Sequence, residues 1–295
     1  MVECLKRLKI GEVKKAVMKN FTTYKVGGKV LALVYPNDIK SLRKLIKYLE
    51  SNKIKYKVIG NGSNLIFSDK GYNGVIIKLS CFKEYKSKGN LFTVGAGYNL
   101  IGFSLKVSNL GYKGLEFVTG IPGTIGGAVF TNAGAYNEDI SKHLVSIKVL
   151  TPEFKIKTLK NKDLNFSYRN SFLKENPKYI CLNATFKLNR GNKEEILNLI
   201  EDRRKRRILS QPLEYPSAGS VFRNPNGLYA GKLIEDLGYK GKYINEAYVS
   251  EKHANFIINK GNAKSVDIKR LICTIKKDVR KKYKIDLILE QEIVN

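Results

Sequence analysis

The sequence predicts an α+β protein of 295 residues that is built from more than one part. Short apolar segments of strand length alternate with longer stretches whose apolar residues recur every three or four positions, the spacing of an amphipathic helix. Hydrophobic residues make up 43% of the chain and charged residues 27%, a composition that excludes a disordered or fibrous protein. The sequence has no internal repeat, and its composition becomes more charged near residues 190–210. We therefore expect the main domain boundary there.

The apolar pattern assigns the elements in order. Spaced apolar residues between Leu5 and Val17 predict a first helix, and a strand-like piece then ends at Gly27 and Gly28. Asn37 and Asp38 are expected to cap a second helix. Further strands are expected over 57–59, 75–79, 91–94, 145–150, 154–158, 179–188, 256–258 and 287–293, and further helices from 99, over 192–209, over 230–237 and after 265.

The charge balance is strongly basic: 54 Lys and Arg against 26 Asp and Glu give a formal net charge of +28. Such a charge is compatible with a nucleic acid, an anionic membrane surface or a phosphorylated small molecule. Lysines outnumber arginines and are spread along the whole chain, which is typical of a solvated surface. Base and bidentate phosphate recognition favours arginine, so we expect no nucleic-acid partner.

The cysteines and histidines do not form a metal site in the sequence. Cys4, Cys81, Cys181 and Cys273 are far apart and make no C-x-x-C pair, and only two histidines are present. We expect reduced thiols and no bound metal. No stretch approaches the roughly 20 apolar residues of a membrane span, which predicts a cytoplasmic protein without membrane insertion.

Two loops are rich in glycine, residues 60–64 and 120–128. Clustered loop glycines often surround a phosphate with backbone N–H groups, although tight turns explain each cluster taken alone. The first loop lacks the Lys-Ser/Thr pair of a P-loop, and the turn at Gly95 and Gly97 has Leu100 where a dinucleotide-binding motif has its third glycine. Residues 120–128 carry no charge and are too apolar for a surface loop. They predict a wall against a large, flat, partly apolar cofactor.

Five segments in order, residues 60–64, 114–128, 132–136, 166–171 and 215–225, closely resemble those of UDP-N-acetylenolpyruvoylglucosamine reductases, the MurB family. The resemblance implies an FAD-binding fold of the vanillyl-alcohol-oxidase type. It divides the chain into two α+β FAD-binding subdomains, 1–80 and 81–204, and an α+β substrate-binding domain, 205–295. This division leaves open whether the C-terminal strand packs with the first subdomain.

The resemblance also implies an activity. Noncovalent FAD and the co-substrate NADPH would reduce the enolpyruvyl group of UDP-N-acetylglucosamine enolpyruvate to UDP-N-acetylmuramate, in peptidoglycan precursor synthesis and cell wall biogenesis. The interval from Tyr168 to Ser220 is short, which resembles the family form that lacks a tyrosine-bearing insertion in the substrate domain. We expect a monomer whose partners are the UDP-sugar and NADPH.

Three catalytic residues follow from the resemblance. Arg169 matches the arginine that binds the substrate carboxylate, Ser220 matches the proton donor, and Glu292 matches the glutamate that polarises the enol. Ser217 lies three residues from Ser220, and Glu290 would share a strand face with Glu292, so alternation alone does not separate the two glutamates. Position in the motif selects Ser220 and Glu292.

The remaining ligand contacts also follow from the resemblance. It assigns the FAD pyrophosphate to Gly60, Asn61, Gly62, Ser63 and Asn64, and the flavin ring and ribityl chain to Gly120, Ile121, Pro122, Gly123, Gly126, Gly127 and Ala128. Tyr168, Asn224 and His253 are expected to contact the substrate, and no residue to bind a metal. The arginines at 203, 204, 206 and 207 are expected to form a solvated helix face with at most one in contact with the diphosphate. Asn245 and Glu246 replace an expected pair of glycines.

Two other functions remain as alternatives. The first is a sugar or alcohol oxidase of the same fold, many of which attach FAD covalently through a His or Cys near the pyrophosphate loop. No His or Cys occurs between Val58 and Ser80. The second is a basic RNA-binding protein without enzymatic activity, which predicts a colourless preparation and salt-sensitive RNA binding.

Overall fold

The computed structural model describes residues 1–295 and divides into two compact units. The first unit comprises residues 1–14, 32–61 and 74–205, and the second comprises residues 15–31, 62–73 and 206–295. The division passes through three strands and one helix, so each unit is assembled from distant parts of the sequence. None of the helices combines the length and the apolar character needed to cross a membrane.

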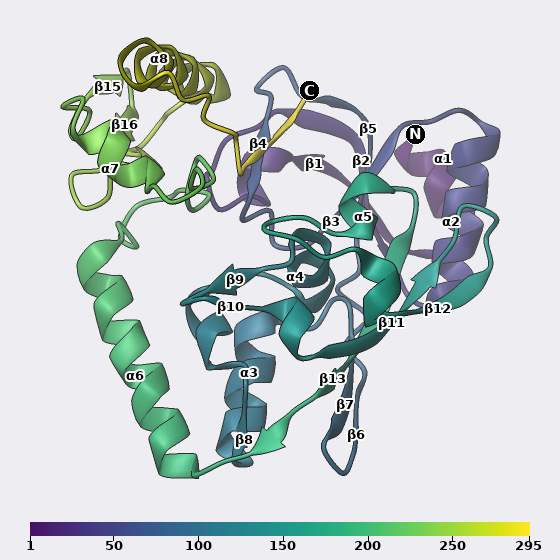
Figure 1. The fold of residues 1–295 in the computed structure, drawn as a ribbon. Helices are drawn as coiled ribbons and strands as arrows, with labels where there is room; N and C mark the ends of the chain where they lie inside the picture. The colour runs from purple at the N-terminus through teal and green to yellow at the C-terminus, as the bar shows by residue number, and fades with distance from the viewer. The chain divides into compact units, whose positions relative to one another are not determined.

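The two larger sheets of the first unit have four and five strands (Figure 1). A four-stranded sheet has the order β1-β2-β5-β3, and the β3–β5 pair is parallel, with Ile59 opposite Lys78. A five-stranded antiparallel sheet has the order β12-β11-β13-β7-β6. The strands are β1 (Gly11–Val17), β2 (Lys29–Pro36), β3 (Tyr56–Ile59), β5 (Tyr72–Lys78), β6 (Tyr85–Lys88), β7 (Leu91–Gly95), β11 (Leu144–Leu150), β12 (Ile156–Lys160) and β13 (Ile180–Lys187).

Helices and short pairings complete the first unit. Helix α4 packs against β7 and β13 of the five-stranded sheet, and α3 contacts the 3-10 turn η2 (Figure 1). The helices are α1 (Val2–Lys6), α2 (Ile39–Ser51), α3 (Leu100–Asn109), α4 (Ile125–Thr131), α5 (Phe172–Glu175) and α6 (Lys193–Ser210), the last of which runs into the second unit. The shorter elements are η2 (Glu116–Gly120), η3 (Ile140–Lys142), η4 (Asn161–Leu164), β8 (Tyr112–Lys113), β9 (Gly134–Ala135), β10 (Glu138–Asp139) and β14 (Asn189–Arg190).

The helix predicted between Leu5 and Val17 is wrong beyond Lys6. Helix α1 ends at Lys6, and β1 follows from Gly11, with Val13 and Ala16 buried on the strand. Gly11 has φ +134°, and a Cβ there would collide with the carbonyl oxygen of Tyr35. The close approach of two strands therefore decides the structure here, and the helical spacing of the apolar residues does not.

The predicted strand before Gly27 and Gly28 is also wrong. Residues Met18–Asn20 form a 3-10 turn, η1, and the segment up to Gly28 has no strand. Strand β2 begins directly after it, at Lys29. By contrast, the capped helix after Asp38 is confirmed, since the Asp38 side chain accepts a hydrogen bond from the Ser41 N–H at 2.7 Å.

The second unit is built around one long amphipathic helix, α8 (Ser265–Tyr283). It packs against the hairpin of β15 (Tyr243–Ile244) and β16 (Ala247–Val249) and against α7 (Ala230–Glu235) (Figure 1). Strand β17 (Ile257–Asn259) extends that hairpin to three strands. The helix predicted after residue 265 is confirmed, and its apolar residues Ile268, Leu271, Ile272, Ile275 and Val279 are buried.

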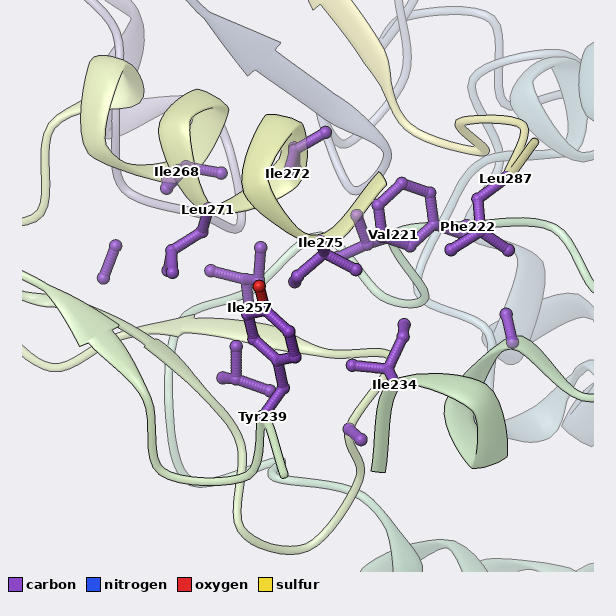
Figure 2. Packing of buried hydrophobic residues seen from close by; sticks show 14 of the residues in the cluster. Val221, Phe222, Ile234, Tyr239, Ile257, Ile268, Leu271, Ile272, Ile275 and Leu287 are labelled. Carbon is purple, nitrogen blue, oxygen red and sulfur yellow. The ribbon is translucent and has the colours of Figure 1, made fainter. Parts of the chain in front are cut away.

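The core of the second unit also holds the segment that follows residue 220. Val221 and Phe222 lie beside Ile275 of α8, with Leu287 close to Phe222 (Figure 2). Both residues are 1% exposed. A side chain at position 220 is therefore carried by a backbone that the neighbouring core residues anchor.

The last strand is shorter than the predicted 287–293. Strand β18 spans Glu292–Val294 and pairs in parallel with β4 (Leu65–Phe67), with Glu292 opposite Leu65. Before it, only Leu289 forms an isolated antiparallel bridge, with Phe222. Residues 287–294 therefore pair first with Phe222 and then with β4. The change of partner interrupts the continuous strand that the sequence predicts.

The pair Asn245 and Glu246, which replaces two expected glycines, is accommodated in the second unit. Asn245 adopts φ +49°, a left-handed conformation that asparagine tolerates better than most residues. Its side-chain amide donates to Asp267 Oδ1 at 3.0 Å, and Asp267 also accepts the Lys264 N–H before α8. Asparagine therefore keeps the turn and adds a bond to the long helix.

Candidate functional site

The first unit brings three glycine-bearing loops together. Position 60 lies against Thr124, because a Cβ on Gly60 would be 2.6 Å from Thr124 Oγ1. The turn after β7 runs beside the start of α4: Gly126 N–H donates to the Ala96 carbonyl at 2.8 Å and Ile125 N–H to the Tyr98 carbonyl at 3.0 Å. The two glycine clusters singled out in the sequence are therefore in contact at residues 60 and 124.

The exposed surface of this loop cluster fits a flat, partly apolar group such as FAD. Residues 121–124 are half-buried or exposed and carry no charge, although they include Ile121 and Pro122. A Cβ built on Gly123 would meet no atom within 4 Å, so the backbone there is bare on one side. A ligand can approach such a backbone directly.

A half-buried lysine lies at the edge of the same region. Lys78 is the last residue of β5 and pairs with Ile59, the last residue of β3, directly before Gly60. Ligands of parallel sheets bind beyond the carboxyl ends of the strands. Burial lowers the pKa of Lys78, as expected for an ammonium group that lacks full hydration. The sequence analysis missed this residue, and the strand-terminal lysine beside the loop was the available signal.

The other half of the first loop belongs to the second unit. Gly62 has φ +67°, and a Cβ there would collide with the carbonyl oxygen of Phe21. Asn64 donates through its side chain to the Glu290 carbonyl at 3.1 Å, and its own carbonyl accepts the Glu292 N–H at 2.9 Å. Asn64 thus holds the segment that carries Glu292, a structural role that the sequence analysis did not assign.

Arg169 lies at the tip of a tight turn in the first unit. Ser167 and Asn170 exchange two backbone hydrogen bonds, of 3.2 and 3.1 Å, which leaves Tyr168 and Arg169 as the two turn residues. Arg169 has φ +58°, a left-handed conformation that is uncommon for a residue with a long side chain. Its guanidinium lies 5.3 Å from the centre of the Tyr168 ring, which is 53% exposed. Strain of this kind often accompanies a functional residue.

The C-terminal end of α4 fixes the Arg169 turn. Asn132, in the left-handed cap of α4, donates through its side chain to the Ser167 carbonyl at 3.1 Å. Ser171 Oγ donates to the Phe130 carbonyl at 2.7 Å. Both ends of the turn are therefore attached to the helix whose other end meets the glycine loops. This explains why the motifs at 120–128, 132–136 and 166–171 occur together.

Ser220 lies in the second unit, in a loop whose backbone is fixed on both sides. Before it, Gln291 Nε2 donates to the carbonyls of Ala218 and Gly219 at 3.2 and 3.0 Å. After it, Val221 N–H donates to the Asn255 carbonyl at 2.9 Å, and the Val221 carbonyl accepts the Glu290 N–H at 2.9 Å. These bonds place the Ser220 loop beside the segment 290–292.

Asn255 completes the support of the Ser220 loop. Its side chain accepts from Phe222 N–H at 2.9 Å and donates to the Phe222 carbonyl at 2.8 Å, and Asn255 is 3% exposed. A buried asparagine with both ends of its amide paired to one residue specifies the local backbone. The sequence analysis did not single out Asn255, although it lies two residues after His253 in the same motif.

Glu292 is half-buried at the first position of β18. It lies close enough to Tyr72 that its charge, together with burial as the larger cause, raises the pKa of the Tyr72 hydroxyl. Glu290 is also half-buried, and the residue between them, Gln291, is 3% exposed. The structure therefore places Ser220 and Glu292 on adjacent segments of one unit, whereas Arg169 belongs to the other unit.

Of the three residues expected at the substrate, Tyr168 lies in the first unit and Asn224 and His253 in the second. Asn224 is exposed, and its side-chain oxygen accepts the Ala230 N–H at 3.1 Å at the start of α7. His253 packs against Gly231, where a Cβ would lie 3.2 Å from the imidazole Cε1. Its Nδ1 accepts the Asn255 N–H at 3.2 Å, and burial lowers the pKa of the imidazole. Both residues therefore have structural partners in addition to any ligand.

The basic end of α6 already has contacts within the protein. Arg204 makes a bidentate pair with Glu201 at 2.8 and 2.9 Å, and the Arg203 guanidinium lies 4.7 Å from the centre of the Tyr136 ring. No group of three or more His, Cys, Asp or Glu side chains is arranged to hold a metal ion.

Comparison with known proteins places these residues in context. A model of the C-terminal domain of UDP-N-acetylenolpyruvoylglucosamine reductase matches residues 211–294, and an FAD binding domain model matches residues 30–160. The chain is 43% identical over 296 residues to the UDP-N-acetylenolpyruvoylglucosamine reductase of Halalkalibacterium halodurans, covering 100% of this chain and 98% of that protein. It is 39% identical over 299 residues to that of Bacillus subtilis, covering 100% and 99%.

A solved structure agrees with these matches. The reductase from Thermus caldophilus, described as MurB, superposes with a TM-score of 0.84 at 33% identity, covering 96% of this chain and 99% of that one. At this coverage the structural match extends over both units, and the two sequence matches, which cover 100% of this chain, include the segments that carry Arg169, Ser220 and Glu292.

Proposed function

Because the chain belongs to the UDP-N-acetylenolpyruvoylglucosamine reductase family of FAD-dependent oxidoreductases, we propose that it uses NADPH to reduce the enolpyruvyl group of UDP-N-acetylglucosamine enolpyruvate. The product would be UDP-N-acetylmuramate, a precursor of peptidoglycan. The structural observation that supports this most is the attachment of the Ser220 loop to the segment of Glu292. Two side chains suited to proton transfer are thereby held in one unit.

FAD supplies, when bound, the hydride that is added to C3 of the enolpyruvyl group. The glycine loops at 60–64 and 120–128 would hold it, the first at the pyrophosphate and the second along the ring and ribityl chain. The bare backbone at Gly123 and the uncharged residues 121–124 fit this assignment. We assign Lys78, at the carboxyl end of β5, to the pyrophosphate charge.

Arg169 would bind the substrate carboxylate. Hydride addition at C3 leaves negative charge that spreads from C2 onto that carboxylate, and a guanidinium can pair with both of its oxygens. The turn at Ser167–Asn170 presents this side chain, with Tyr168 beside it as a substrate contact. The interaction grows stronger as charge develops, so it lowers the barrier and does more than bind the substrate.

Ser220 would deliver the proton to C2. A serine hydroxyl is a poor acid in water, and it becomes an effective donor only to a strongly basic carbon in a site shielded from solvent. The hydride at C3 and the proton at C2 together saturate the double bond, and the proton is regained from solvent after each turnover. Asn224 and His253 are proposed to contact the rest of the substrate.

Glu292 would polarise the enol, either as a protonated acid that donates a hydrogen bond or through an intervening group. Glu292 lies close enough to Tyr72 that its charge adds to burial, the larger cause, in raising the pKa of the Tyr72 hydroxyl.

We propose that the enzyme acts as a monomer in the cytoplasm, where NADPH and nucleotide sugars are available. Its net charge of +28 would attract FAD, NADPH and the UDP-sugar, all of which carry phosphates. The charge therefore affects the rate of encounter and the sensitivity to salt, whereas specificity rests on the residues above.

The test is an assay of the purified protein. We expect a yellow preparation whose flavin is released by denaturation, and NADPH consumption that depends on the UDP-enolpyruvyl sugar. Flavin that stays with the denatured polypeptide, or a colourless protein that binds RNA, would favour one of the two alternatives over the reductase.

A further inference from the structure

We propose that Gln291 is a positioning residue for Ser220, an inference that rests on the proton-donor role proposed above. Gln291 lies between Glu290 and Glu292 and is 3% exposed. It connects the loop of the proton donor to the strand that carries Glu292. Through this connection it sets the direction from which the Ser220 hydroxyl reaches C2 of the substrate.

The hydrogen bonds of Gln291 act on the residues directly before Ser220. Its Nε2 donates to the Ala218 carbonyl at 3.2 Å and to the Gly219 carbonyl at 3.0 Å. Both acceptors are carbonyl oxygens, so only the NH₂ side of the amide can face them, and this fixes the orientation of the side chain. The peptide that joins Gly219 to Ser220 is thereby held through its oxygen.

Packing alone does not hold this peptide. Gly219 has φ +72°, and a Cβ built there would meet no atom within 4 Å. A glycine in open space is free to take several backbone conformations. The bonds that Gln291 donates on one side, and the bond that the Val221 N–H donates to the Asn255 carbonyl on the other, select one of them.

The far end of the Gln291 amide lies beside Tyr24. Burial raises the pKa of the Tyr24 hydroxyl, and a side-chain interaction with Gln291 opposes that shift, so the two side chains are neighbours. The buried amide therefore lies between Tyr24 and the Ser220 loop, to which its NH₂ group donates. An apolar side chain of the same shape could fill this space but could not donate to the two carbonyls.

The first experiment compares Gln291→Met with the wild-type holoenzyme. Methionine has a similar shape but no donor, so the Ser220 loop loses both bonds. We expect the step in which the reduced enzyme reacts with the UDP-enolpyruvyl sugar to slow by about 10- to 100-fold. Reduction of the bound flavin by NADPH should keep its rate, because that step does not involve Ser220. Anaerobic stopped-flow absorbance separates the two steps.

Gln211→Met is the matched control. Gln211 is a half-buried glutamine of the same unit, and no bond from its side chain reaches the Ser220 loop. We expect both steps to keep their rates in this variant. A slow NADPH step in Gln291→Met would show general damage to the fold and would contradict the specific role.

Gln291→Glu is a second test of the donor role, because glutamate has nearly the same shape as glutamine. A carboxylate at this position repels the two carbonyls, whereas the protonated acid can donate to one of them. We expect its reaction with the sugar to quicken, relative to the wild type, as the pH falls. A variant with the wild-type rate at every pH would overturn the inference.

A double-mutant cycle with Ser220→Ala distinguishes this inference from the proposed function. If Gln291 acts through Ser220, then Gln291→Met should cause little further loss in the Ser220→Ala background. Additive losses would show that Gln291 acts elsewhere. A wild-type rate for Ser220→Ala alone would overturn the proton-donor role itself, whereas a slow Ser220→Ala beside a fast Gln291→Met would overturn only the role of Gln291.

Discussion

The Arg169 turn and the Ser220 loop present their side chains in opposite ways. Arg169 lies at the tip of a two-residue turn next to an exposed Tyr168; the ends of the turn are attached to α4, and Lys174 Nζ donates to the Arg169 carbonyl at 2.9 Å. The Ser220 loop is followed at once by two core residues, Val221 and Phe222, and is bonded to two buried amides, Gln291 and Asn255. Arg169 therefore has an exposed neighbour, whereas Ser220 lies between backbone groups that are bonded to buried side chains.

The difference corresponds to what each residue is proposed to do. A guanidinium attracts a carboxylate over several ångströms and can follow it, so the Arg169 arm tolerates small displacements. Proton transfer requires hydrogen-bond distance and a defined direction, so a displacement of about 1 Å is costly. If so, substitutions at Arg169 should act through its charge, whereas substitutions around Ser220 should act through the position of its hydroxyl.

Loss of charge at residue 169 should have the largest effect. In Arg169→Met the substrate carboxylate and the developing charge lose their cation, and we expect kcat to fall by about 10²- to 10³-fold. Arg169→Lys keeps the charge without the planar fork and should retain a larger share of the activity. Steady-state rates with the UDP-enolpyruvyl sugar measure both, and a wild-type rate for Arg169→Met would exclude the assigned role.

Removal of the carboxyl group at residue 292 should follow in size. Glu292→Gln is expected to lower kcat by about 10²-fold, because the amide cannot act as an acid. Glu290→Gln, two residues away, is the comparison that the sequence left open, and we expect a much smaller loss. The reverse order of the two effects would move the role from Glu292 to Glu290.

Asn255 should matter for stability as well as position. Asn255→Ala leaves the buried N–H and carbonyl of Phe222 without side-chain partners, and we expect the free energy of unfolding to fall by about 2 to 3 kcal/mol. Urea unfolding of the holoprotein measures this. Asn183→Ala, which removes only a 3.5 Å bond to Glu84 in the first unit, should change little. Equal losses of unfolding free energy in Asn255→Ala and Asn183→Ala would mean that the bonds of Asn255 to Phe222 do not stabilise the Ser220 loop.

The left-handed Gly219 gives a smaller test. Gly219→Ala meets no steric obstacle, so its cost is the conformational preference of alanine, about 1 to 2 kcal/mol. Gly219→Asn should cost less, because asparagine tolerates this conformation better. Thermal unfolding of the two variants should show this order, and equal unfolding temperatures for wild type and Gly219→Ala would show that the loop adapts.

The smallest expected effect is a pH dependence at His253. Burial lowers the pKa of its imidazole in the folded protein, so protonation favours the unfolded state. The stabilisation is therefore complete above the ordinary histidine pKa of about 6.5 and is lost as the pH falls through it. Unfolding curves between pH 7.5 and 5 should show a steeper loss for the wild type than for His253→Gln. Parallel losses would assign the pH dependence to other groups.

Much of the fold could be predicted from the sequence because the apolar residues of many helices and strands recur with the spacing typical of that element. The stripe of α8, the Asp38 cap and the strands around 145–150 and 180–187 are visible locally and were found. The N-terminal segment was misread because its strand depends on a close approach at Gly11 to Tyr35, which no local pattern reveals. The last strand was overextended because its two pairing partners, β4 and Phe222, are far away in the sequence.

For the candidate site, the sequence predicts the proposed catalytic residues but not the residues that position them. Its principal residues lie in recognisable motifs, so Arg169, Ser220 and Glu292 could be named from the sequence. The residues that hold them could not: Gln291, Asn255 and Asn132 act through side-chain hydrogen bonds to backbone atoms more than 30 residues away. Such bonds depend on the fold and leave no spacing pattern in the chain.

The most direct test of the account is an anaerobic reaction of the prereduced holoenzyme with the UDP-enolpyruvyl sugar. For the wild type, the absorbance of oxidised flavin should return only when the sugar is added, with formation of UDP-N-acetylmuramate. In Ser220→Ala it should return at least about 100-fold more slowly, while reduction by NADPH stays at the wild-type rate. Recovery at the wild-type rate in Ser220→Ala would contradict the central claim that Ser220 supplies the proton.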